Sequence, residues 1–140
     1  IYALGGRRNL LSPYSIEMFD PRVGKWRELK SHAAFFSSCA ATLYGDHIYA
    51  FGGDNFLIYD IRANNWKTCE KPPKCDLFMQ AITFCGEIVL LGGSKSSRQT
   101  DVVSTVEIYN IRKDKWEEGR NLMEPLTYHC AVVAYPDIVL

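Results

Sequence analysis

Short apolar runs that end in two glycines recur along this chain. They read "IYALGG", "IYAFGG" and "IVLLGG", and their glycines are Gly5 and Gly6, Gly52 and Gly53, and Gly92 and Gly93. Each is followed by a variable stretch and then by a second short run, in which an aromatic residue precedes a tryptophan by seven positions. These aromatic and tryptophan residues are Phe19 and Trp26, Tyr59 and Trp66, and Tyr109 and Trp116. Self-similarity of this kind predicts a repeat architecture.

The repeat has a variable length. Ile1, Ile48, Ile88 and Ile138 occupy equivalent positions, at spacings of 47, 40 and 50 residues. The differences fall in the stretch after the glycines and in the stretch before the next repeat. We therefore expect both of those stretches to be loops.

The sequence of each repeat unit predicts four short strands. In the second copy they read "SCAATL", "HIYAF", "FLIY" and "WKTC", and β-branched and aromatic residues dominate the middle two. Gly45 and Asp46 separate the first two strands. In the first copy, Asp20 and Pro21 separate the last two, where Asp20 is expected to accept backbone hydrogen bonds. Four strands joined in sequence by short connections predict an antiparallel meander.

The second strand of each unit is apolar on both faces, so it needs a covering layer on each side. In "IYAF", Tyr49 and Phe51 alternate with Ile48 and Ala50. Stacking four-stranded sheets around an axis buries both faces, which favours an all-β propeller over a solenoid or a sandwich. Exposed edge strands at both ends are an aggregation hazard. We therefore expect further blades in a longer polypeptide.

The glycine pair, the aromatic residue and the tryptophan together resemble the kelch repeat. The spacing is most similar to the kelch domains of BTB-kelch (Kelch-like) proteins, which implies a propeller of about six blades. Phe19 and Asn110 are mild departures, in place of a Tyr and an Asp. We assign residues 1–30 to the end of one blade, 33–70 to a second, 77–120 to a third and 127–140 to the start of a fourth.

Composition and charge narrow the classes of partner. Sixteen basic and sixteen acidic residues cancel, with no basic run, which argues against nucleic acid or a membrane surface as partner. With 47% hydrophobic and 13% aromatic residues, the chain has enough apolar material for a packed core. Its apolar stretches are shorter than the roughly twenty residues of a membrane span. A protein or small molecule is the expected partner.

No catalytic, metal or cofactor pattern emerges from the sequence. The five cysteines, Cys39, Cys69, Cys75, Cys85 and Cys130, form no Cys-x-x-Cys motif and are expected to be reduced thiols. The glycine pairs lack the Gly-Lys-Ser/Thr ending of a phosphate loop. The histidines and carboxylates show no metal-ligand or acid–base spacing. We therefore predict a non-catalytic module without a cofactor.

The connections after the second and fourth strands should share one face, and that face carries the candidate binding residues. Its basic side chains suit carboxylates or phosphates, and its aromatic side chains suit a polypeptide partner. The alternative for any one of them is a solvated charge or a loop-packing ring. The candidates are Arg7, Arg8, Tyr14, Phe36, Ser38, Asp54, Asn55, Phe78, Lys95, Arg98, Tyr128 and His129.

The resemblance to BTB-kelch proteins implies a function for this face. It would capture a degron peptide, while a BTB domain elsewhere in the protein recruits a cullin-type ubiquitin ligase. Ser38, Phe78 and Tyr128 are equivalent in the repeat and lie where that family places substrate-contacting side chains. An actin-binding scaffold is the alternative, and an enzyme built on a kelch propeller is a third. The expected location is the cytoplasm, with the cytoskeleton or nucleus as alternatives.

Overall fold

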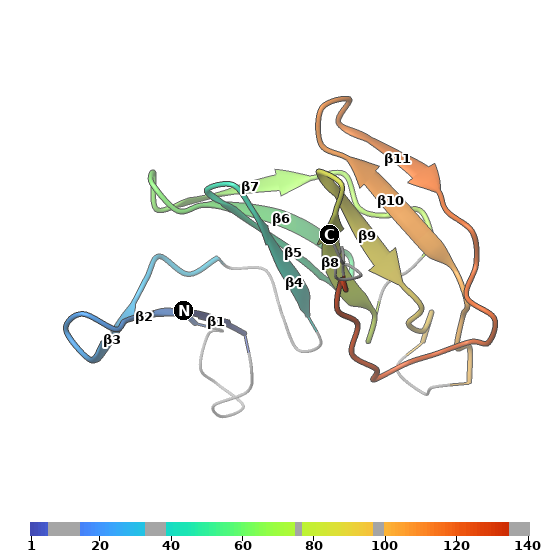
Figure 1. Ribbon diagram of the computed structural model, residues 1–140, viewed down its shortest axis with the longest axis horizontal. Helices are drawn as coiled ribbons and strands as arrows, with labels where there is room; N and C mark the ends of the chain where they lie inside the picture. Colours follow the sequence, from blue (N-terminus) through green and yellow to red (C-terminus); the bar gives the residue numbers. More distant parts are fainter. Residues whose placement is uncertain (6–14, 33–38, 75–76, 97–99, 135–140) are drawn as a thin grey trace, which may run out of the picture.

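Three antiparallel sheets make up the described part of the chain (Figure 1). The computed structural model describes residues 1–5, 15–32, 39–74, 77–96 and 100–134. The first sheet comprises β1 (Tyr2–Leu4), β2 (Ile16–Asp20) and β3 (Lys25–Glu28). The second comprises β4 (Ala40–Tyr44), β5 (His47–Gly52), β6 (Asn55–Asp60) and β7 (Asn65–Cys69). The third comprises β8 (Gln80–Phe84), β9 (Glu87–Leu91), β10 (Val106–Asn110) and β11 (Lys115–Glu118).

Each sheet is a meander in which neighbours in sequence are neighbours in space. This confirms the all-β class and the four-strand reading of the second and third units. The register explains the seven-residue spacing between the aromatic residue and the tryptophan. Tyr59 pairs with Trp66 and Tyr109 with Trp116 across the last hairpin, so the two rings of each pair lie beside each other.

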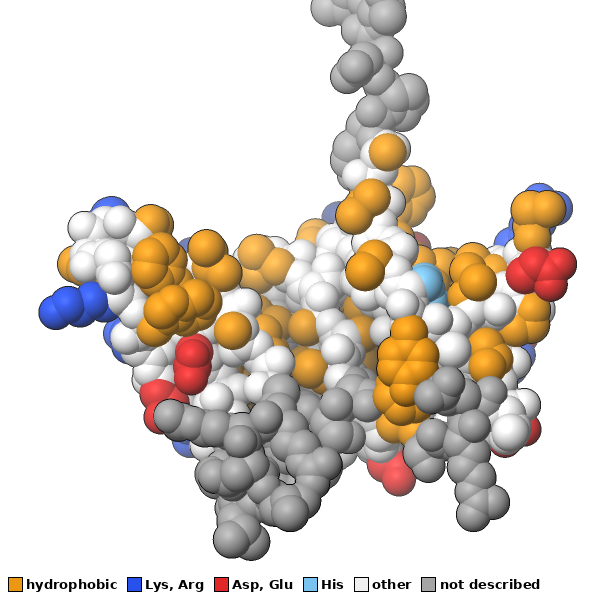
Figure 2. All heavy atoms as spheres, turned by 90° about the horizontal axis from the view of Figure 1, so that it is seen from below, with side chains coloured by type: hydrophobic (Ala, Val, Ile, Leu, Met, Phe, Trp, Pro, Cys, Tyr) orange, Lys and Arg blue, Asp and Glu red, His pale blue; other side chains and the backbone are white. Residues whose placement is uncertain are grey.

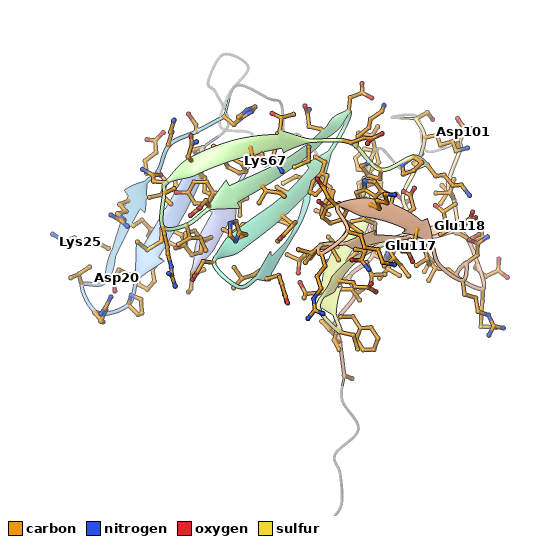
Figure 3. All side chains as sticks on the ribbon, turned by 90° about the horizontal axis from the view of Figure 1, so that it is seen from above. Asp20, Lys25, Lys67, Asp101, Glu117 and Glu118 are labelled. Carbon is orange, nitrogen blue, oxygen red and sulfur yellow. The ribbon has the colours of Figure 1, made fainter. Side chains whose placement is uncertain are left out.

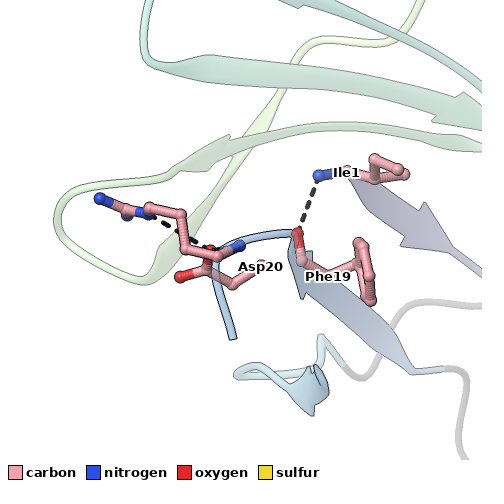
Figure 4. Close-up of polar contacts among 4 residues, drawn as sticks. Ile1, Phe19 and Asp20 are labelled. Atoms are coloured by element: carbon pink, nitrogen blue, oxygen red, sulfur yellow. Dashed lines mark hydrogen bonds and ion pairs between the residues drawn. The ribbon is translucent and has the colours of Figure 1, made fainter. Parts of the chain in front are cut away.

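The turn between the last two strands has the same construction in each sheet. The Asp20 carboxylate accepts a hydrogen bond from the Arg22 backbone N–H at 2.9 Å, and that bond lowers the pKa of Asp20 (Figure 4). Just before the adjacent strand β1, Ile1 N donates to Phe19 O at 3.1 Å. Asp60 likewise accepts from the Ala63 N–H at 2.8 Å. These contacts confirm the predicted role of Asp20 in the turn.

The largest buried cluster lies between the second and third sheets, a smaller one lies between the first and second, and strand β5 contributes to both. Ile48, Tyr49, Ala50 and Phe51 are all buried, so both faces of this strand are covered as its composition predicts. The largest cluster joins Tyr49, Phe51 and Phe56 of the second sheet to residues of the third, among them Leu90 and Tyr109. The sheets are therefore held together mainly by apolar and aromatic contacts.

Tryptophans join each sheet to the one before it. Trp66 Nε1 donates to the Lys30 carbonyl at 2.7 Å, and Trp116 Nε1 donates to the Glu70 carbonyl at 3.1 Å. Lys30 and Glu70 both follow the last strand of the preceding sheet. Trp26, at the equivalent position of the first sheet, is 51% exposed. The same indole contact thus occurs at both boundaries between described sheets.

After β11, the chain runs below the third sheet and returns toward its edge strand β8 (Figure 1). Residues 127–134, which we expected to begin a further blade, form no strand. Their predicted partner strand falls in residues 135–140, outside the described part. The blade boundaries therefore stay a prediction.

Candidate functional site

The connections after β5, β7, β9 and β11 emerge at one end of the sheets, which we call the loop face (Figure 1). Its described residues are 53–54, 70–74, 77–79, 92–96, 100–105 and 119–129. The short turns lie at the other end, which we call the turn end. Seen from the loop face, hydrophobic side chains gather in several patches, and charged side chains lie mostly toward the margins (Figure 2).

The structure describes half of the predicted binding residues. Arg7, Arg8, Tyr14, Phe36, Ser38 and Arg98 lie outside the described residues. Asp54, Asn55, Phe78, Lys95, Tyr128 and His129 lie within them. Lys95 is exposed, and its backbone N–H donates to Asp101 O at 3.1 Å.

Phe78 and Tyr128 form an aromatic pair on the loop face. Their ring centroids are 4.4 Å apart at an interplanar angle of 32°, and the Tyr128 N–H donates to Phe78 O at 3.4 Å. Tyr128 is 59% exposed, while Phe78 is half-buried. The pair therefore presents one accessible aromatic ring supported by another.

Both residues have a left-handed backbone, with φ of 56° at Phe78 and 53° at Tyr128. Bulky residues rarely adopt this conformation, because their Cβ approaches the backbone too closely. Such strain costs about 1–3 kcal/mol and persists where the surrounding structure enforces it, often at functional sites. The shared φ also agrees with the equivalence of positions 78 and 128 in the repeat.

Gly92 and Gly93 support the segment that carries Tyr128. Gly93 N donates to Leu126 O at 2.7 Å. A Cβ at Gly92 would lie 2.5 Å from that same Leu126 oxygen, and Gly92 has a φ of +58°. Only glycine permits this close approach. The glycine pair thus positions the segment of the next repeat that carries Tyr128.

His129 lies inward from Tyr128. Its ring carbon would be 3.0 Å from a Cβ at Gly92, so the imidazole packs over the glycine. Both ring nitrogens are buried and have no hydrogen-bond partner among the described residues. The imidazole therefore contributes to the packing of the 126–129 segment against Gly92.

Asp54 and Asn55 lie at the tight turn between β5 and β6. The Lys71 ammonium donates to the Asp54 carboxylate at 2.5 Å, which lowers the pKa of Asp54. Asn55 opposes Gly52 at the end of the ladder. Asp54 is therefore neutralised by a lysine on the next connection.

The described residues contain no group of three or more His, Cys, Asp or Glu side chains that could hold a metal ion. The four cysteines in the described ranges, Cys39, Cys69, Cys85 and Cys130, are free thiols. In those same ranges, no helix is long and apolar enough to cross a membrane.

Comparison with known proteins identifies the family to which the chain belongs. The family model for the Kelch motif matches residues 1–32 and 78–123, more than half of the chain. The chain belongs to the kelch-repeat family. Its three sheets are therefore blades of a kelch β-propeller.

Individual relatives carry the same repeat. The chain is 26% identical to Kelch-like protein 36 of Bos taurus over 87% of its own length and 22% of that protein. It is 22% identical to Kelch-like protein 35 of Mus musculus over 90% of its length. It is 26% identical to the human Kelch repeat and BTB domain-containing protein 8 over 86% of its length. The chain thus spans about a fifth of the length of these relatives.

Two residues of this kelch loop face were not among the sequence-based candidates. Lys71 neutralises Asp54, and Ser94, which is fully buried, exchanges backbone hydrogen bonds with Leu77 at 2.8 and 3.2 Å. The Ser94 bonds anchor the connection that carries Phe78. Lys71 could have been selected from its place after the fourth strand, whereas no sequence signal identifies the pairing of Ser94 with Leu77.

Proposed function

We propose that this chain is the partner-binding propeller of a BTB-kelch adaptor for a cullin-type ubiquitin ligase. The bound partner is a polypeptide segment that lies on the loop face. The accessible Tyr128 ring, supported by Phe78 and held in a strained backbone, is the observation that carries the proposal. Exposed aromatic anchors of this kind contribute strongly to interface affinity.

Family membership supports the proposed role as an adaptor for a ubiquitin ligase. One relative is named as containing both Kelch repeats and a BTB domain. In the proposed arrangement, a BTB domain outside this chain recruits the cullin, while the propeller selects the substrate.

The basic side chains of the loops suggest the nature of the segment. Lys95 is exposed on the loop face, and Arg7, Arg8 and Arg98 belong to connections predicted on the same face. Guanidinium and ammonium groups bind carboxylates and phosphates with charge-assisted hydrogen bonds. The bound segment is therefore acidic or phosphorylated, and charge reversal at Arg7 and Arg98 should abolish its binding.

The adaptor role can be tested with the full-length protein in cells. It should co-purify with a cullin and with at least one further protein whose ubiquitylation falls when the adaptor is depleted. Re-expression of a Tyr128→Ala variant should restore the cullin complex without restoring that ubiquitylation. Absence of any cullin, together with co-sedimentation with actin filaments, would instead favour the scaffold alternative.

A further inference from the structure

Glu107 of β10 is a buried carboxylate at a repeat position that carries a leucine in the second blade. It is 3% exposed, and its counterpart Leu57 is fully buried, in a cluster with Leu4 and Cys39. Burial of a carboxylate costs free energy unless hydrogen bonds or an opposite charge compensate for it. Because an apolar side chain fills the same position one blade earlier, core packing alone does not explain the glutamate.

The Glu107 side chain contacts the connection between β7 and β8. Its Oε1 accepts a hydrogen bond from the Lys74 backbone N–H at 2.9 Å. Glu118, which faces Glu107 across the β10–β11 ladder, binds the Lys74 ammonium at 2.5 Å. Hydrogen bonds to ionised acceptors are stronger than those between neutral groups. The two glutamates of one cross-strand pair therefore hold Lys74 by both its main chain and its side chain.

The boundary between the first and second blades has a different composition at these positions. Ala34, Leu57 and Thr68 stand where the second boundary has Lys74, Glu107 and Glu118. Ala34 itself lies outside the described residues. The three charged residues thus occur together at one boundary and are together replaced by uncharged residues at the other.

Lys74 belongs to the connection that carries Phe78, four positions later. Between them, Leu77 exchanges backbone hydrogen bonds with Ser94, and the Phe78 carbonyl accepts the Tyr128 N–H. The connection is therefore attached to β10 and β11 at Lys74 and to the β9–β10 connection at Leu77. Without the first attachment, the chain that leads to Phe78 is less constrained.

We propose that Glu107 is a positioning residue of the loop face. Together with Glu118, its carboxylate sets the course of the β7–β8 connection, so that Phe78 supports the Tyr128 ring. This role rests on the proposed function, in which the aromatic pair is the anchor for a partner. Local rules of burial are commonly broken at functional sites. The buried carboxylate thus contributes to binding rather than to the stability of the fold.

The test follows hydrogen–deuterium exchange of single backbone amides by mass spectrometry in the full-length protein. Glu107→Leu introduces the residue type of Leu57. It should speed exchange of the Lys74 amide about tenfold, because the bond to the carboxylate is lost, and that of the Tyr128 amide about threefold, because Phe78 is less firmly held. Exchange in β8 should not change, since the substitution also removes the cost of a buried charge. Glu107→Gln keeps an acceptor and should restore slow exchange at both amides.

Glu17→Leu is the matched control, because Glu17 is the counterpart of Glu107 in the first blade. The last hairpin of that blade, marked by Asp20 and Lys25, lies far from Glu118 (Figure 3). The control should leave both amides unchanged. A purely structural role predicts instead that Glu107→Leu speeds exchange in β8 and β9 as much as at Lys74. That result, an unchanged Tyr128 amide or a response to Glu17→Leu would each overturn the proposal.

Glu118→Gln provides a second variant in case Glu107→Leu does not fold. It changes an exposed side chain and removes the charge that binds the Lys74 ammonium. Exchange at Lys74 and Tyr128 should rise in the same order as with Glu107→Leu but by a smaller factor. Unchanged exchange at both amides would contradict the role of the glutamate pair.

Co-purification from cells tests the consequence for binding. Any partner lost with Tyr128→Ala should also decrease with Glu107→Leu and return with Glu107→Gln. If Tyr128→Ala loses no partner, the proposed function fails, and the exchange of the Tyr128 amide still decides whether Glu107 positions the aromatic pair. If a partner is lost with Tyr128→Ala but retained with Glu107→Leu, only the positioning role fails.

Discussion

The two ends of the blades contrast sharply. At the turn end, Gly24, Asn64 and Asp114 occupy one repeat position, and all have a left-handed backbone with φ of 64°, 50° and 53°. At the loop face, Gly53 and Asp54 form a two-residue hairpin in one blade. In the next blade, Gly92 and Gly93 instead begin a connection that reaches residue 105.

This difference separates the scaffold from the proposed binding surface. At the turn end, every blade has a tight link between paired strands, and the same kind of hydrogen bond stabilises that link in each blade. At the loop face, the connections differ in conformation from blade to blade, because each is stabilised by contacts with other connections. Changes at the turn end should therefore affect stability alone, whereas changes at the loop face can affect binding without affecting stability.

The largest expected effect comes from Gly92→Ala. Its new Cβ would meet the Leu126 oxygen at 2.5 Å in a backbone of positive φ. We expect a loss of about 3 kcal/mol in the free energy of unfolding, measured by urea denaturation. Gly53→Ala is the control, since φ is +55° but no atom lies within 4 Å of the added Cβ. It should cost about 1 kcal/mol, and equal losses for the two variants would refute the steric argument.

Tyr109→Phe should have a smaller effect, of about 1 kcal/mol, because it removes the hydrogen bond to Asp114. Burial, assisted by the nearby Asp114, raises the pKa of Tyr109 above its ordinary value. The stability from this group is present below the tyrosine's ordinary pKa of about 10 and is lost as the pH rises above it. Unfolding curves at neutral and alkaline pH should show a steeper alkaline loss for the wild type than for Tyr109→Phe. Identical slopes would contradict this assignment.

The turn carboxylates should produce a weaker effect in acid. Backbone hydrogen bonds lower the pKa of Asp20 and of Asp60. Their contribution is present above the ordinary aspartate pKa of about 3.9 and is lost as the pH falls through the lower folded values. The double variant Asp20→Asn with Asp60→Asn should flatten the acid limb of the stability curve. Asn110 already stands at this position in the third blade, so Asn110→Asp should steepen that limb, and a change in the opposite direction would contradict the account.

Local and repeated features of the molecule were predictable from the sequence. The Tyr59–Trp66 and Tyr109–Trp116 pairs follow from a spacing that places two residues opposite each other in a hairpin. The burial of both faces of β5 follows from its uniformly apolar composition. These features depend on residues that are close in the chain.

Contacts between distant segments were not predictable in the same way. The repeat register made Phe78 and Tyr128 equivalent, but their stacking depends on the paths of two connections fifty positions apart. The groove of about 640 Å³ between β7 and β10–β11 depends on how the second and third blades pack against each other. The ion pair between Asp54 and Lys71 likewise depends on the three-dimensional course of two loops.

The central claim is that the loop face binds a protein partner through Tyr128. The most direct measurement compares, by quantitative mass spectrometry, the proteins that co-purify with full-length wild type and with Tyr128→Ala. Tyr44→Ala is the matched control, since this tyrosine is 39% exposed and lies at the turn end. We predict that at least one partner falls about tenfold with Tyr128→Ala, a loss of about 1.4 kcal/mol, and is retained with Tyr44→Ala. Identical sets of partners for all three proteins would contradict the account.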